Sequence, residues 1–287
     1  MTSKAHSHIP QTLSLVPVAP SNLPSIDVLV RDGRTAMDAS VSWKGGKTFG
    51  DVKTFSYKEE GRGPVASWHC RVSRYHREDI TFNQLWEQLG KTKRANEKRW
   101  VAVQFSCRRL AVIVRFNPTV KEATQIQCMS EWESIWSIYC TYPPPMSPRV
   151  FTELFVSHLN DYPTQKRTGN PDRITVSIPV DMSSAKDMTE LEEKGVRARR
   201  VRVEMVEELD DGIIEWRLIT CEDIGGILPR GCAERRMPRA IAKEVVAFMT
   251  WFRALPTKRK PKKDGQGTQG KGKGKGKGKV VQSIYNV

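Results

Sequence analysis

The feature that most constrains the fold is a succession of alternating apolar and polar positions between residues 173 and 218. Three segments there each have one apolar face, formed by Ile174, Val176, Ile178 and Val180, by Val201, Val203 and Met205, and by Ile214, Trp216 and Leu218. Alternation with a period of two predicts strands with one buried face. Asp210-Asp211-Gly212 predicts a hairpin turn between the last two strands. Consecutive strands of this kind indicate an antiparallel sheet.

A helix is predicted after these strands, from Pro238 to about Leu255. Proline is favoured in the first turn of a helix, and Pro256 forbids its continuation. Its apolar stripe is formed by Ile241, Val245, Phe248 and Phe252 and is widened by Ala242, Val246, Met249 and Trp251. We therefore expect this helix to be nearly enclosed. Strands followed by a long helix favour an α+β fold.

The first half of the chain contains further predicted elements. Residues 52–57 and 66–73 are predicted strands, and the second has an apolar face (Trp68, Cys70, Val72) and a polar face (His69, Arg71, Ser73). Residues 25–40 predict a helix that Gly33 weakens, and Thr81 caps a predicted helix over 82–89. Ser147 and Pro148 predict the start of another helix, which carries Val150, Phe151, Leu154 and Phe155.

The two ends of the chain differ from its middle in composition. Residues 1–24 predict a disordered leader, residues 25–256 one folded domain, and residues 257–287 a disordered Gly/Lys tail. The net charge is +15, but residues 258–279 hold ten basic residues and one acidic residue. The predicted polyanion-binding residues are Lys258, Arg259, Lys260, Lys262, Lys263, Lys271, Lys273, Lys275, Lys277 and Lys279. A flexible polycation binds nucleic acid or an anionic membrane leaflet by releasing counterions, or it serves only as a solubilising appendage.

The sequence contains no pattern typical of a metal site, a membrane span or a catalytic site. The six cysteines form no Cys-x-x-Cys pair and no signal peptide precedes them, which indicates free thiols, a reducing compartment and no metal site. No apolar run approaches the roughly 18 residues of a membrane span. His69, His76, Glu222 and Asp223 are the only evident acid–base residues, and their spacing gives no nucleophile–base pair. We expect a non-enzymatic protein without a cofactor, cytoplasmic or with nuclear or peripheral membrane localisation, and monomeric.

Four sequence landmarks together resemble those of a fungal START-like family of uncharacterised function. They are Trp68 to Ser73 with His76, Tyr142 to Phe151, Trp216 with Asp223 to Pro229, and Pro238 to Lys243 with Phe248 and Trp251. The resemblance implies a helix-grip fold, in which a curved antiparallel sheet surrounds a long C-terminal helix and leaves a cavity. Related START proteins bind sterols, phospholipids or other apolar ligands in that cavity.

The resemblance makes a set of residues candidates for ligand binding, each with a structural alternative. Arg71 is the candidate for contact with a polar head group, unless its strand face meets water. The candidate apolar contacts are Trp68, Met205, Trp216, Ile241, Phe248 and Trp251, and such side chains are also ordinary core residues. Asp223, Gly225 and Gly226 form a candidate gate, or a turn that needs positive φ.

Two functions follow from these expectations. The first is binding, with transfer as an extension, of a lipid or other apolar ligand, with the basic tail on an anionic membrane. The second is a nuclear or RNA-associated interaction protein whose tail binds nucleic acid.

Overall fold

The structure is a computed structural model that describes residues 8–58, 66–89, 119–144, 146–160, 172–226 and 229–254. Residues up to 254 form one compact unit. The predicted basic tail lies outside the described residues, as does Cys107.

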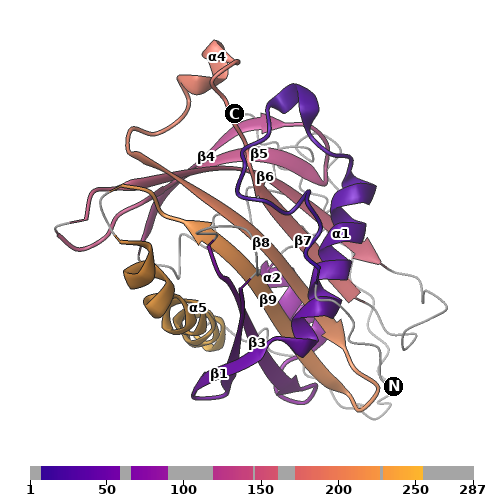
Figure 1. The fold of residues 1–287 in the computed structure, drawn as a ribbon. Helices are drawn as coiled ribbons and strands as arrows, with labels where there is room; N and C mark the ends of the chain where they lie inside the picture. The colour runs from indigo at the N-terminus through magenta and orange to yellow at the C-terminus, as the bar shows by residue number, and fades with distance from the viewer. Residues whose placement is uncertain are drawn as a thin grey trace, which may run out of the picture. The chain divides into compact units, whose positions relative to one another are not determined.

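One curved sheet of nine strands forms the centre of this unit (Figure 1). Its strands are β1 (Lys44–Phe49), β2 (Val52–Tyr57), β3 (Trp68–His76), β4 (Val120–Cys128), β5 (Glu133–Cys140), β6 (Arg149–Asn160), β7 (Asp172–Pro179), β8 (Val196–Glu208) and β9 (Ile213–Asp223). The order across the sheet is β1-β2-β3-β9-β8-β7-β6-β5-β4, and all these neighbours are antiparallel. Only the first three residues of β6 also pair with β8, in parallel.

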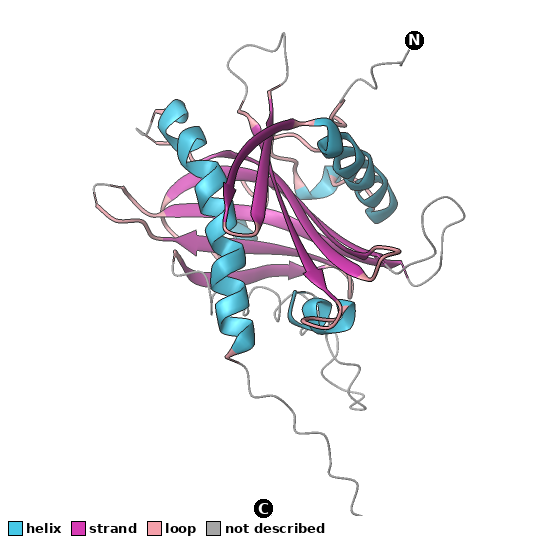
Figure 2. Ribbon diagram, turned by 90° about the horizontal axis from the view of Figure 1, so that it is seen from below, coloured by secondary structure: helices cyan, strands magenta, loops and turns pink. Residues whose placement is uncertain are grey.

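Helices α1 and α5 lie against the sheet (Figure 2). The helices of the described residues are α1 (Ile26–Ala39), α2 (Phe82–Leu89), α4 (Lys186–Thr189) and α5 (Arg230–Arg253), with 3-10 turns at Pro20–Asn22 and Ser40–Ser42. Helix α1 packs on β6, β7 and β8, and α5 packs on β1, β2 and β3. The observed sheet and C-terminal helix confirm the predicted α+β helix-grip class.

The α1 side of the sheet contains the largest apolar cluster, which includes Leu29, Val176 and Val203. Ile9 and Leu13 belong to this cluster and are 6% and 2% exposed. The segment before α1 is therefore packed from Ile9 onward, which differs from the disordered leader expected over 1–24. Val18 explains part of this order, because its backbone bonds to Pro179 and Asp181 beside β7.

Most local predictions are confirmed. Residues 26–39 are helical, and β2, β3, β7, β8 and β9 lie where alternation predicts them. Thr81 caps α2 with Gln84, because the Gln84 amide donates to Thr81 Oγ1 at 3.2 Å and the Thr81 amide donates to Gln84 Oε1 at 2.9 Å. The predicted turn before β9 contains Gly212 at φ 74°.

The helix predicted after Ser147 and Pro148 is wrong, because residues 149–160 form strand β6. This strand lies between β5 and β7, and its residues 150–156 are buried on both faces of the sheet. Leu154 joins the α1-side core, whereas Phe151 and Phe155 belong to a cluster with Trp136 of β5. Burial on both faces produced an apolar pattern that also fits a helix.

Helix α5 differs from its prediction in two ways. It begins at Arg230 rather than Pro238, so Pro238 lies inside it. The helix is also not enclosed, since Val246 is 57% exposed while Ile241, Val245 and Phe248 are buried. The first turns of α5 carry mainly arginines on their exposed side. They contain no apolar stripe, so the start of the helix at Arg230 could not be predicted from the sequence.

Candidate functional site

The sheet face beneath α5 carries charged side chains. Trp216 packs with Phe248 of α5, and Leu218 packs with Met237 and Ile241. Side chains of directly paired residues lie on the same face. Leu218 of β9 pairs with Arg71 of β3 on one side and with Glu204 of β8 on the other. Arg71 and Glu204 are therefore on the α5 side of the sheet.

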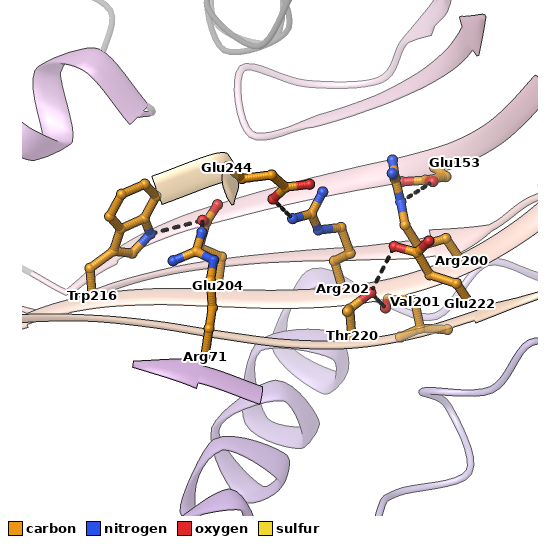
Figure 3. A network of polar contacts seen from close by, with 10 residues as sticks. All are labelled: Arg71, Glu153, Arg200, Val201, Arg202, Glu204, Trp216, Thr220, Glu222 and Glu244. Atoms are coloured by element: carbon orange, nitrogen blue, oxygen red, sulfur yellow. Dashed lines mark hydrogen bonds and ion pairs between the residues drawn. The ribbon is translucent and has the colours of Figure 1, made fainter. Parts of the chain in front are cut away.

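Arg71 and Glu204 form the first ion pair on this face (Figure 3). Its Nη2 donates to Glu204 Oε1 at 3.0 Å, and its guanidinium lies 4.2 Å from the centroid of the Trp216 ring. Trp216 Nε1 donates to the same Glu204 oxygen at 2.8 Å. The Arg71 side chain is 1% exposed, and its Nε and Nη1 have no hydrogen-bond partner among the described residues. Burial lowers the pKa of Arg71, and Glu204 opposes that shift.

The second ion pair connects the sheet to the helix. Arg202 Nη2 of β8 lies 2.5 Å from Glu244 Oε2 of α5 (Figure 3). The two side chains are 17% and 24% exposed, so water screens the pair only in part. The Glu244 carboxylate therefore points from α5 toward the sheet.

The third ion pair lies further along β8. Arg200 Nε is 2.9 Å from Glu153 Oε1, and the Glu153 side chain is fully buried on β6. Glu222 of β9 pairs with Arg200 in the register and accepts a hydrogen bond from Thr220 at 3.3 Å. Burial raises the pKa of Glu222, while Arg200 and Arg202 act to lower it. Arg71–Glu204, Arg202–Glu244 and Arg200–Glu153 are together called the ion-pair row below.

A pocket of about 410 Å³ opens at the turn between β9 and α5, where residues 222–226, Arg230 and Ala233 line it. Gly225 and Gly226 have φ values of 58° and 72°. Arg149, which is 3% exposed, holds this turn by donating to the Ile224 carbonyl at 2.7 Å and to the Gly225 carbonyl at 3.4 Å. The predicted gate residues Asp223, Gly225 and Gly226 thus border a pocket that Glu222 also lines.

The predicted ligand-binding residues are divided between the two faces of the sheet. Trp216, Ile241 and Phe248 lie on the same side as Arg71, and the Trp216 and Phe248 rings are 5.1 Å apart. Trp251 is half-buried against Phe248, at 5.7 Å between ring centroids.

Trp68 and Met205 do not belong to this group. They lie in the α1-side core, where the Trp68 ring is 6.2 Å from Trp43. Trp68 and Arg71 are three positions apart, so they lie on opposite faces of β3. Both faces are buried over residues 68–73, so the polar face of β3 does not meet water.

Sequence reasoning missed most of the ion-pair row. Arg200, Arg202 and Glu204 alternate with apolar residues, which is also the pattern of a strand with one wet face. Their partners Glu153 and Glu244 are far away in the sequence, so no local signal indicated the pairing.

No group of three metal-ligating side chains occurs among the residues that the structure describes. The cysteines Cys70, Cys140 and Cys221 are buried, and burial raises the pKa of the Cys70 thiol to about 11. No helix in the described ranges is long and apolar enough to cross a membrane.

Solved structures with similar folds are StAR-related lipid transfer domains. The lipid transfer and protein localization domain of human StarD13 (DLC2) has a TM-score of 0.52 at 14% identity, covering 79% of this chain and 98% of that one. Human StAR-related lipid transfer protein 5 has a TM-score of 0.57 at 12% identity, covering 79% and 94%. A StAR-related lipid transfer protein from Xanthomonas axonopodis has a TM-score of 0.51 at 14% identity, covering 74% and 98%. These likenesses show a START-like fold.

A family model described as "Protein of unknown function (DUF3074)" matches residues 68–252, more than half of the chain. The chain belongs to the DUF3074 family. The match runs from the first residue of β3 almost to the end of α5, so it includes every member of the ion-pair row. No curated protein matches this DUF3074 chain.

Proposed function

We propose that this DUF3074 chain binds a lipid or another largely apolar ligand between the sheet and α5, without chemical conversion. The observation that carries the proposal is Arg71, whose Nε and Nη1 are buried without a partner among the described residues. An unsatisfied buried donor costs about 1–3 kcal/mol, and more when it is charged. A ligand oxygen at Arg71 removes that cost. The START-like fold adds support, because human StarD13 and human StAR-related lipid transfer protein 5, which have similar folds, are described as lipid transfer proteins.

The charges around Arg71 indicate which kind of ligand oxygen can bind there. The ion-pair row and Glu222 bring together three arginines and four glutamates. Three positive and four negative charges leave the set with a net charge of −1 when every group is ionised. An anionic ligand would add to this excess of negative charge. We therefore propose a hydroxyl or carbonyl oxygen as the polar group, with Trp216, Ile241, Phe248 and Trp251 contacting the apolar part. The turn at Asp223, Gly225 and Gly226 is the proposed entry.

Native mass spectrometry tests this proposal directly. The full chain is incubated with a natural lipid extract, separated from free lipid by gel filtration and weighed. We expect a bound mass of lipid size, and Arg71→Met should reduce loading about tenfold or more, because a hydrogen bond to a charged group contributes about 1.5–3 kcal/mol.

Two variants act as controls in that experiment. Arg74→Met changes an arginine on the same strand whose side chain is 59% exposed, and it should load normally. Arg71→Lys keeps the positive charge. It should load more lipid than Arg71→Met if the loss in Arg71→Met comes from the missing charge and not from a change in the fold. Normal loading by Arg71→Met, or no loading by the unchanged protein, would contradict the proposal.

We also propose that the ten basic tail residues attract the protein to anionic membranes. Each contributes about 1 kcal/mol near a charged leaflet, and salt weakens the attraction. Replacing all ten by Gln in the full chain should reduce flotation with vesicles that contain phosphatidylserine. Unchanged flotation together with lost RNA retention would assign the tail to nucleic acid instead.

A further inference from the structure

The charges of α5 are segregated between its two sides. The helix contains six basic residues, of which Arg230 is at the start and Arg253 at the end, and two acidic residues, Glu234 and Glu244. Both acidic residues point toward the sheet, since Glu234 accepts a hydrogen bond from the Ser67 amide at 3.0 Å and Glu244 pairs with Arg202. The other side of the helix therefore carries cations without acidic neighbours on α5.

Four of those cations and one apolar residue form an exposed stripe. Arg235, Arg239, Lys243 and Val246 are spaced by four, four and three residues, so they follow one side of the helix, and Arg236 flanks them. All five are exposed, and Val246 has 57% of its surface free. No ion pair to any of the four cations occurs among the residues that the structure describes. These five residues are called the basic face of α5.

We propose that the basic face of α5 is a docking surface for an anionic lipid membrane. Phosphate and carboxylate head groups complement its four unpaired cations, and an exposed valine among them offers apolar surface to the boundary of the leaflet. Single-stranded nucleic acid is the other polyanion, but it needs aromatic side chains for base stacking. The aromatic residues of α5 do not serve that purpose, because Phe248 is buried and Trp251 and Phe252 pack beside it.

The basic face of α5 lies close to the proposed ligand entry, which suits exchange of ligand with a membrane. This link to ligand exchange is the only part of the inference that rests on the proposed function. The 410 Å³ pocket lies at the N-terminal end of α5, bordered by Arg230 and Ala233. Arg235 and Arg236 follow within two turns of the helix. A membrane that binds the basic face thus lies beside the proposed entry.

The test is flotation with vesicles of phosphatidylcholine alone or with phosphatidylserine, using the full chain with its ten tail cations replaced by Gln. The α5 variant carries Arg235→Gln, Arg239→Gln and Lys243→Gln. About 1 kcal/mol per cation corresponds to about fivefold each, so the partition coefficient for anionic vesicles should fall on the order of a hundredfold. Val246→Asp should weaken binding as well.

A matched control removes three exposed cations elsewhere, by Lys121→Gln, Lys194→Gln and Arg199→Gln, so the net charge is the same. This control should bind within about twofold of its parent. Equal losses in the two triple variants would overturn the proposal in favour of net charge alone, and retained flotation with lost RNA binding would assign the face to nucleic acid. Lipid loading of the α5 variant should be normal, so a failure of docking is distinguishable from a failure of ligand binding.

Discussion

Arg202 Nη2 on β8 lies 2.5 Å from Glu244 Oε2 on α5. This ion pair joins helix α5 to the sheet face that the helix covers. Glu244→Ala should lower the free energy of unfolding by about 1–3 kcal/mol, because it leaves a largely buried guanidinium without its partner. Urea denaturation measures this loss.

A double-mutant cycle separates the ion pair from packing. Glu244→Ala combined with Arg202→Met should cost clearly less than the sum of the two single changes, since residues in contact show coupling. Lys243→Gln, next to Glu244 but exposed, should leave stability unchanged within about 0.5 kcal/mol. Additive single effects would mean that the pair does not hold the helix.

The sheet strands were predictable from sequence because alternation is a local property. Residues 172–179 and 213–223 alternate regardless of which side is solvated, so β7 and β9 were predicted near their true positions. The nature of the polar side was not predictable. On β8, Arg200 and Arg202 have the pattern of a wet face, yet both have carboxylate partners on β6 and α5.

Two errors have the same physical origin. The segment from Val150 to Phe155 fits a helical stripe only because β6 is buried on both faces, with Leu154 in the α1-side core and Phe151 in the cluster on the other face. Conversely, α5 was predicted to begin eight residues late because its first two turns hold few apolar residues. In both cases the tertiary environment, not the local pattern, decided the outcome.

Gly225→Ala should destabilise the turn between β9 and α5. The residue has a φ of 58°, and an added Cβ would lie 2.8 Å from the Arg197 carbonyl oxygen. Strain and steric overlap together should cost about 1–3 kcal/mol in a denaturation experiment. Gly231→Ala is the matched control, because a Cβ there meets no atom within 4 Å, and it should be neutral or slightly stabilising. Equal effects of the two changes would show that the turn tolerates a side chain.

His69 should make the protein less stable as the pH falls from about 7 to about 5. Burial lowers the pKa of His69 below its usual value of 6.5, with Glu234 opposing the shift, and neither ring nitrogen has a hydrogen-bond partner among the described residues. The unfolded chain therefore binds a proton that the folded chain does not, so stability decreases below pH 6.5. Glu222, whose pKa is raised by burial, acts in the opposite direction above pH 4.5.

The contribution of His69 is obtained by comparing variants at each pH. His69→Gln should flatten the decline in unfolding free energy across this range, whereas His76→Gln, exposed at the end of the same strand, should retain it. Identical pH profiles for His69→Gln and the unchanged protein would contradict this assignment.

Gly33→Ala should reverse the usual effect of this substitution in a helix. In an exposed helix interior, alanine is about 1 kcal/mol more favourable than glycine. Gly33 is buried in α1, however, and an added Cβ would lie 2.8 Å from Val176 Cγ2, 3.1 Å from Ile174 Cδ1 and 3.3 Å from a Val203 methyl. Because overpacking of a tight core costs about 1–3 kcal/mol, thermal and urea unfolding should both show a loss of stability. A gain would mean that α1 can move away from β7 without cost, and that the close approach does not require glycine.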